Sequence, residues 1–327
     1  MPQQHSGLVS SMFRNYRNNF GLFWRVMLPL IILNFLLYMG MFLIIKLVSP
    51  EGQWTISTSS ILATHTSSSQ LAQPTSVVWG TNFGFSSISI GLLWLAVCPL
   101  AYTIVQRRNG IDLTFKTAWQ RTLRKTTSIL GSTFLIGLLA LGFPLIFGFL
   151  AFEIFFKELV ASSGPTLFFV FSCITAAWFV LVLYFVVKWS LYNQGIIIEN
   201  LSIIAALRRS SELVRGAWWR FFGIYLLLIW ASTVLTSLML GLTIGLLSFA
   251  VPELIPIREV LQPAKLVSLL VGGYGKITLG GTPNFWTIGV IVSVYTLIHA
   301  ILAPIWASLT TQLYMERTGE HEQQVSA

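Results

Sequence analysis

Charged residues are scarce in this sequence. Only 9% of its 327 residues are Asp, Glu, Lys or Arg, whereas a soluble domain has roughly 25%. Hydrophobic residues make up 55% of the chain. This balance excludes an ordinary soluble domain and predicts an all-α, polytopic integral membrane protein.

Groups that carry out chemistry are also few. The 2 cysteines, Cys98 and Cys173, both fall inside apolar runs, so no disulfide framework or metal cluster is implied. The 11 acidic residues form no close carboxylate pair inside an apolar run, and no His-x-x-x-His, Glu-x-x-His or Walker-type glycine motif occurs. We therefore expect no enzyme activity, no metal and no cofactor.

Long apolar runs are what the sequence has in abundance. A helix rises about 1.5 Å per residue, so about 20 apolar residues cross a hydrocarbon core of about 30 Å. The runs lack the alternation of barrel strands, and no small-x-small cleavage site closes the first of them. We predict a single membrane domain, residues 1–327, with six spans at about 26–48, 87–106, 129–156, 166–187, 221–250 and 285–314.

Most of the 20 Lys and Arg residues flank these runs on one side. They precede the first run, separate the second from the third and the fourth from the fifth, and follow the sixth. Because cytoplasmic flanks are rich in Lys and Arg, we predict that both termini are cytoplasmic. Loops 49–86 and 251–284 should lie on the opposite side of the membrane.

Basic amphipathic segments precede several of the spans. In the best example, Leu207 and Val214 share one helical face, which Ser210 interrupts, while Arg208 and Arg215 occupy the other face. Several arginines at mid-bilayer would cost several kcal/mol, so such a helix should lie in the headgroup layer. We predict interfacial helices at about 8–21, 112–127 and 201–217.

The interfacial segments resemble one another. Arg14, Gly21, Trp24 and Arg25 recur with the same spacing as Arg209, Gly216, Trp219 and Arg220. We interpret the chain as three repeated units, each an interfacial helix followed by a transmembrane hairpin. The alternative is that any helix starting at the cytoplasmic surface attracts Arg, Trp and Gly.

The net charge of +9 requires partners of opposite charge. Nucleic acid is excluded because the basic residues follow the starts of the spans and have no stacking aromatic platform. Anionic lipid headgroups suit them, at about 1 kcal/mol for each Lys or Arg near the surface, and a membrane-protein partner is the other option. The predicted contact residues are Arg14, Arg17, Arg121, Arg124, Arg208, Arg209, Arg215 and Arg220.

Three intramembrane polar residues are further candidates: His299, Asn34 and Glu153. For each of them we favour a structural role. His299 should hydrogen-bond a neighbouring helix, Asn34 should join helices, and Glu153 should pair with Lys157 at the outer end of the third span.

One long run of the sequence has a recognisable pattern. An apolar stretch reaches Glu199, an Ala-Leu-Arg-Arg-Ser helix follows, and the last span closes on Leu313, Tyr314, Glu316 and Arg317. Over about residues 95–320 this pattern resembles the membrane domain of glycerophosphoryl diester phosphodiesterases and its polytopic relatives. The family's proline before Glu199 is missing, and Gly195 is expected to supply the flexibility between the fourth span and its interfacial helix.

The resemblance implies a bacterial plasma (inner) membrane. It does not imply hydrolysis, because the His-Arg-Gly motif of the family's soluble catalytic domain occurs nowhere in this sequence. We predict a non-enzymatic membrane protein that scaffolds a partner or organises anionic lipid at the cytoplasmic face. The alternative is a transporter or permease component with a path between helical repeats, and an intramembrane enzyme ranks third.

The topology can be tested with reporter fusions at residues 65 and 270. Both reporters should be active outside the cytoplasm, because most Lys and Arg residues lie on the other side of the predicted spans. A fusion at residue 115 is the matched control and should report the cytoplasm. A cytoplasmic signal from residue 65 or residue 270 would overturn the predicted orientation.

Overall fold

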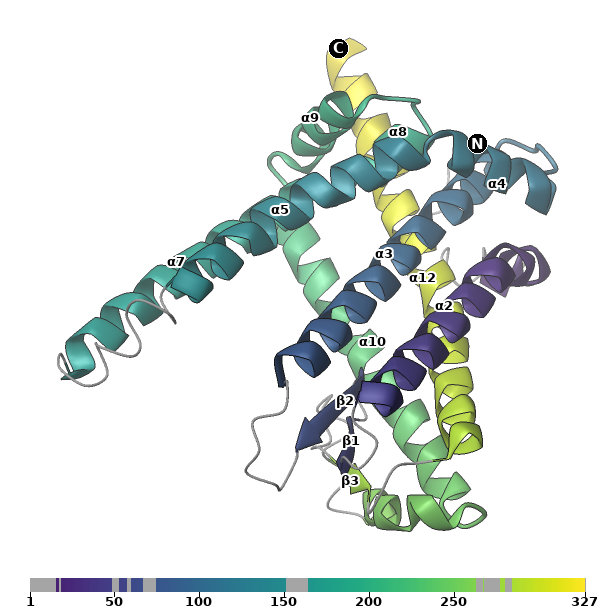
Figure 1. Ribbon diagram of the computed structural model, residues 1–327. Coiled ribbons are helices and arrows are strands. Elements are labelled where there is room, and N and C mark those ends of the chain that lie inside the picture. Colours follow the sequence, from purple (N-terminus) through teal and green to yellow (C-terminus); the bar gives the residue numbers. More distant parts are fainter. Residues whose placement is uncertain are drawn as a thin grey trace. The chain divides into compact units, whose positions relative to one another are not determined.

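The fold was analysed in a computed structural model of the chain, which describes residues 16–17, 19–48, 53–57, 60–66, 75–150, 164–262, 267, 277–279 and 284–326. The described chain is predominantly helical (Figure 1). It divides into two compact units: unit 1 holds residues 1–100 and 224–309, and unit 2 holds residues 101–223 and 310–327. Each unit is described separately below.

Long helices occur at all the predicted spans. They are α2 (Phe20–Val48), α3 (Thr75–Arg108), α5 (Thr126–Leu150), α7 (Gly164–Lys188), α10 (Trp218–Leu247) and α12 (Phe285–Ser326). Within the described residues, 4 segments are long and apolar enough to cross a membrane: Phe20–Ile44, Ser172–Ile197, Trp218–Leu247 and Phe285–Gly319. These helices are consistent with a membrane protein, while the six-span count and the threefold repeat stay predictions.

Helices occur at two of the three segments predicted to be interfacial, and both lie in unit 2. The first is α4 (Phe115–Arg124), at whose start the Thr114 hydroxyl accepts a hydrogen bond from the Thr117 N–H at 3.4 Å. The second is α9 (Ile203–Val214), which buries its apolar side. In the third predicted helix, 8–21, residues 8–15 and 18 lie outside the described residues.

Two helices are followed by a glycine with a left-handed backbone conformation. Gly110 follows α3 with φ of 76°, and Gly216 follows α9 with φ of 79°. Both values lie in the left-handed region, where a side chain would clash with the backbone.

The described chain is helical apart from one small sheet in unit 1, which the sequence analysis did not predict. Strands β1 (Gln53–Ser57), β2 (Ser60–Thr66) and β3 (Ile277–Leu279) pair antiparallel in the order β2-β1-β3. In this register Thr55 faces Thr64 of β2 and Thr278 of β3. The loops predicted at 49–86 and 251–284 therefore contain strands, and α3 already begins at Thr75.

Unit 1 has its core where α2, α10 and α12 meet. Phe42 of α2, Leu240 and Ile244 of α10, and Ile291 of α12 are all 2% exposed or less. The short 3₁₀ helix η2 (Pro252–Leu261) closes onto α10, where the guanidinium of Arg258 donates to the Ser248 carbonyl oxygen at 2.8 Å and 3.2 Å.

Unit 2 is built around a helix that stops and restarts. Helix α7 ends at Lys188, a turn follows, and α8 (Tyr192–Ile197) continues with every one of its residues buried. The hydroxyl groups of Tyr192 in α8 and Thr133 in α5 are 2.7 Å apart, and Gln194 donates to Thr310 of α12 at 2.8 Å. Helix α8 is thus tied on two sides by polar contacts.

Candidate functional site

The candidate site is the polar surface that α8, α9 and the end of α12 form in unit 2. It begins at the break between α7 and α8, where two backbone groups lose their helical partners. The buried hydroxyl of Ser210 in α9 accepts a hydrogen bond from the Leu191 N–H at 3.1 Å and donates to the Lys188 carbonyl at 3.0 Å. One serine therefore holds α9 against the break.

After α8 the chain turns sharply at Asn200, which adopts a left-handed φ of 62°. Asparagine tolerates this conformation better than most residues. The turn therefore lies at Asn200 and at the break before α8, and the expectation that Gly195 provides the flexibility is wrong because Gly195 lies inside α8.

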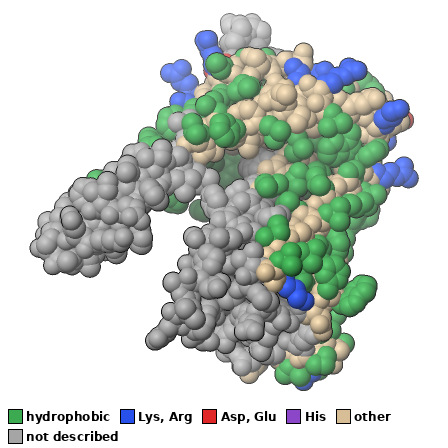
Figure 2. All heavy atoms as spheres, in the orientation of Figure 1, with side chains coloured by type: hydrophobic (Ala, Val, Ile, Leu, Met, Phe, Trp, Pro, Cys, Tyr) green, Lys and Arg blue, Asp and Glu red, His purple; other side chains and the backbone are tan. Residues whose placement is uncertain are grey.

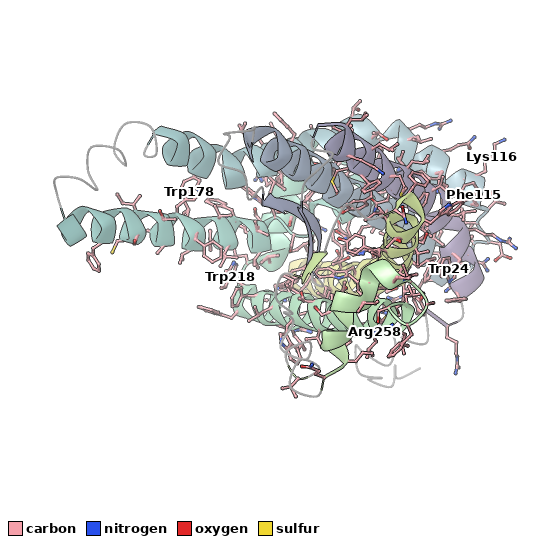
Figure 3. The ribbon with its side chains drawn as sticks, turned by 60° about the horizontal axis from the view of Figure 1, so that its bottom comes forward. Trp24, Phe115, Lys116, Trp178, Trp218 and Arg258 are labelled. Carbon is pink, nitrogen blue, oxygen red and sulfur yellow. The ribbon has the colours of Figure 1, made fainter. Side chains whose placement is uncertain are left out.

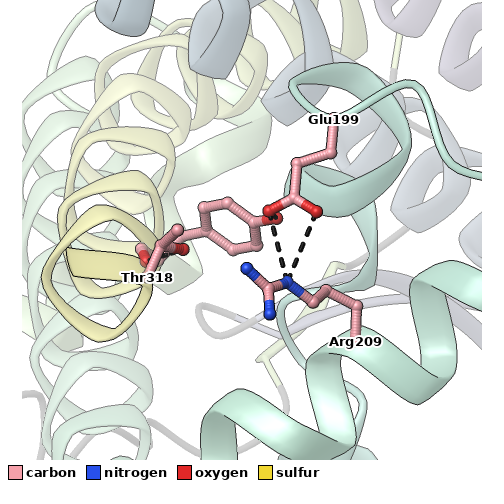
Figure 4. Close-up of polar contacts among 4 residues, drawn as sticks. Glu199, Arg209 and Thr318 are labelled. Atoms are coloured by element: carbon pink, nitrogen blue, oxygen red, sulfur yellow. Dashed lines mark hydrogen bonds and ion pairs between the residues drawn. The ribbon is translucent and has the colours of Figure 1, made fainter. Parts of the chain in front are cut away.

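The turn exposes the carboxylate of Glu199 to two partners from different elements (Figure 4). The Arg209 Nε of α9 donates to it at 3.3 Å, and the Tyr314 hydroxyl of α12 donates to its Oε1 atom. Both charged side chains are largely enclosed, with 20% of Arg209 and 27% of Glu199 exposed. A charge-assisted contact in such a place is stronger than one in open water.

The pairing with Glu199 further favours the charged form of Arg209. Burial of the guanidinium lowers the pKa of Arg209, while the neighbouring Glu199 carboxylate raises it, and the net pKa lies above the usual value for arginine. Arg209 is therefore a fixed internal cation.

The end of α12 makes two further contacts with α9 and α10. Arg317 donates from Nε to the Leu213 carbonyl at 2.9 Å and from a terminal nitrogen to the Arg215 carbonyl at 3.2 Å. These carbonyls belong to the last turn of α9, where a cation also matches the helix dipole. Glu316 pairs with Arg220 at 2.7 Å.

We name this set the α12 clasp. It consists of Glu199, Arg209, Arg220, Tyr314, Glu316 and Arg317. Two of the predicted contact residues, Arg209 and Arg220, therefore bind carboxylates of the same unit.

The other predicted contact arginines are placed differently. Arg208 pairs with Glu212 at 3.2 Å but is 82% exposed. Arg124 and Arg215 are exposed, and neither side chain forms an ion pair within the described residues.

Arg121 lies 6.0 Å from the centre of the Tyr102 ring. Arg17 is exposed next to α2, and Arg14 lies outside the described residues.

The intramembrane candidates show no common site. The Nδ1–H of His299 donates to the Tyr295 carbonyl of its own helix at 2.9 Å, whereas a bond to a neighbouring helix was expected. Asn34 is buried, and its side-chain oxygen accepts no hydrogen bond from a described residue. Glu153 and Lys157 lie outside the described residues.

The described part of the chain contains no cluster of side chains suited to binding a metal ion. There, no three His, Cys, Asp or Glu residues come together as metal ligands would. The prediction of a non-enzymatic protein stays a prediction.

A comparison with family models identifies the chain's relatives. The model described as "Domain of unknown function (DUF7847)" matches residues 34–316. The chain belongs to the DUF7847 family. No curated protein and no solved structure matches it significantly.

The DUF7847 match spans most of the clasp, from Glu199 to Glu316. The resemblance to the phosphodiesterase membrane domain drew attention to Glu199 and the Tyr314–Arg317 tail without giving their role. The geometry of this DUF7847 chain gives one, because these residues join α12 to α9.

Sequence analysis missed Ser210 and the pair of Gln194 and Thr310. The signal at Ser210 was a hydroxyl in the middle of an apolar helical face, which was interpreted as an interruption. A buried hydroxyl in such a position needs partners, and the ends of α7 and α8 supply them.

The energetic contribution of the Glu199–Arg209 pair to the clasp can be measured with a double-mutant cycle on Glu199→Gln and Arg209→Gln. We expect a coupling of about 1 to 2 kcal/mol in the free energy of unfolding, because both side chains are mostly buried. Unfolding would be followed in a denaturing-detergent titration.

The matched control is the cycle on Arg208→Gln and Glu212→Gln, the exposed pair on the same helix. It should give only a few tenths of a kcal/mol. A clasp coupling no larger than this control would show that the clasp does not fix α9.

Proposed function

We propose that this chain is a non-enzymatic, multi-pass membrane protein that organises anionic lipid at the cytoplasmic face of a bacterial inner membrane. The observation that carries the proposal is the division of the arginines in unit 2. Arg209 and Arg317 are partly enclosed and bound to other segments of the protein, and Arg220 is 47% exposed but bound to Glu316. Arg124 and Arg215 are exposed without an ion pair among the described residues, and Arg208 is 82% exposed and pairs only with Glu212 of its own helix. An exposed pair of this kind is weak, so these three cations can still meet phosphate groups.

The helices that carry the exposed arginines support this proposal. Helix α4 buries Ala118 and Thr122 and presents Arg124, whereas α9 buries Leu213 and presents Arg208. A helix that is buried on one side and basic on the other suits the headgroup layer. Within the described surface drawn in Figure 2, hydrophobic side chains form broad patches, as expected of a protein covered by lipid.

Aromatic side chains next to α9 favour the same location. Trp218, at the start of α10, stacks on Phe222 at 5.1 Å and on Tyr184 of α7 at 6.0 Å (Figure 3). Its neighbour Trp219 is 77% exposed. Tryptophan and tyrosine gather at the boundary between lipid and water, which would put α9 at that level.

The lipid proposal can be tested with the variant Arg124/Arg208/Arg215→Gln. It should retain far less anionic phospholipid after gentle extraction, since each basic residue near the surface contributes about 1 kcal/mol. Native mass spectrometry of the wild-type and variant proteins would count the bound lipids.

A charge-matched control is Lys46/Lys265/Lys276→Gln, which removes three cations predicted to lie on the other side of the membrane. Its anionic-lipid content should match the wild type. Equal retention in both variants, or equal loss in both, would refute the proposal. A stoichiometric protein lost only from the arginine variant would instead identify this surface as a scaffold for that partner.

A transporter is the second candidate, and a buried amide favours it. Asn193 in α8 is 1% exposed, and neither its oxygen nor its nitrogen has a hydrogen-bond partner among the described residues. The neighbouring α7–α8 break is the kind of interrupted helix that transporters use around a substrate. A polar solute would satisfy such an amide.

The variant Asn193→Leu separates the two candidates. If no solute binds there, the melting temperature should rise and lipid retention should not change, because two buried polar atoms without partners are removed. Gln194→Leu is the control and should lower the melting temperature, since it breaks the bond to Thr310. A fall in the melting temperature of Asn193→Leu would point to a bound polar occupant and favour transport.

A further inference from the structure

An apolar groove runs along α7 in unit 2. Its volume is about 160 Å³. Six residues of α7 and the turn after it recur at the spacing of a single helical face, and one residue of α5 forms the opposite wall. The lining residues are Trp178, Leu181, Val182, Phe185, Val186, Trp189 and Ile136.

Helices α5 and α7 run side by side, so the start of α5 and the end of α7 lie at the same end of this pair (Figure 1). The groove begins near that end, at Trp189. At about 1.5 Å per residue, Ile136 and Trp178 both lie about 15 Å from that end. The α7 stripe from Trp178, labelled in Figure 3, to Trp189 is about 16 Å long. The groove is therefore long and narrow and runs along the helices.

A cation lies over the end of the groove. The ammonium of Lys188 is 5.7 Å from the ring centre of Phe185, which lines the groove, and 5.4 Å from that of Tyr184. Lys188 forms no ion pair with a described carboxylate. Arg124, exposed just before the start of α5, adds a second positive charge to this end of the hairpin.

The bulky side chains of α7 that line the groove disfavour the packing of another membrane helix into it. Close packing of two membrane helices needs small residues, which allow the backbones to approach. The α7 stripe has only Trp, Leu, Val and Phe. A single flexible hydrocarbon chain can follow the spaces between such bulky side chains, and its charged headgroup would meet Lys188.

We propose that this groove binds one acyl chain of an anionic phospholipid, with the phosphate facing Lys188. The inference rests on the proposed function and deepens it, because it names one lipid site within the protein. It is distinct from the exposed Arg208 and Arg215 at α9, whose contacts with headgroups need no groove, and it shares only Arg124 with that surface.

The test uses the purified full-length protein and phosphatidylglycerol with a photoreactive diazirine in its acyl chain. Crosslinks mapped by mass spectrometry should concentrate on the groove residues, such as Val182 and Val186. Phosphatidylcholine with the same acyl chain is the control probe and should label these residues far less. Lys188→Gln should reduce the phosphatidylglycerol labelling roughly fivefold.

A second variant tests the proposal by filling the groove with a larger side chain. Val182→Trp should abolish labelling, whereas Val180→Trp should not, because Val180 is 65% exposed and does not line the groove. Melting temperatures would confirm that both variants fold. If Val182→Trp does not fold, the Lys188→Gln variant still tests the proposal.

Three results would overturn the groove proposal: labelling spread evenly onto Phe179 and Val180, equal labelling by both probes, or unchanged labelling of Lys188→Gln. If the groove is unlabelled while the arginine surface still retains anionic lipid, the groove proposal alone fails. If anionic lipid is retained at neither place, the proposed function fails with it.

Discussion

The carboxylate of Glu199 joins the consecutive helices α8 and α9 to the end of α12, where Tyr314 lies 115 residues further along the chain. It is bound by Arg209 of α9 and Tyr314 of α12, and it stands at the turn that ends the α8 segment. A helix of 12 residues such as α9 is marginal in isolation, so its position depends on contacts with the rest of the protein. Glu199, Ser210 and Arg317 supply these contacts, and the exposure of Arg208 and Arg215 follows from them.

The sequence predicted the long helices and the buried side of α9 because both depend on local periodicity. The apolar spacing that includes Leu207 and Val214 is present in the structure, where both residues are buried. The strands were missed for the opposite reason. Each is short, and β1 pairs with β3, which lies more than half of the chain away, so no local pattern marks the pairing.

The candidate site was predictable as a region but not residue by residue. Arg208 and Arg209 are neighbours with the same side chain, yet one is 82% exposed and the other 20%. The difference comes from Glu199 and Tyr314, whose approach is a property of the tertiary structure. The net charge of +9 is consequently a poor measure of the charge that lipid can meet, since part of it is bound within the clasp.

Ser210 also links the two lipid-facing features that we propose. Its hydroxyl binds the carbonyl of Lys188, whose ammonium lies over the groove, and it belongs to the same helix as Arg208. The end of α7 and the basic face of α9 are thus held together inside unit 2. An acyl chain in the groove and a headgroup near α9 would therefore contact neighbouring parts of one unit, joined by the Ser210 hydrogen bond.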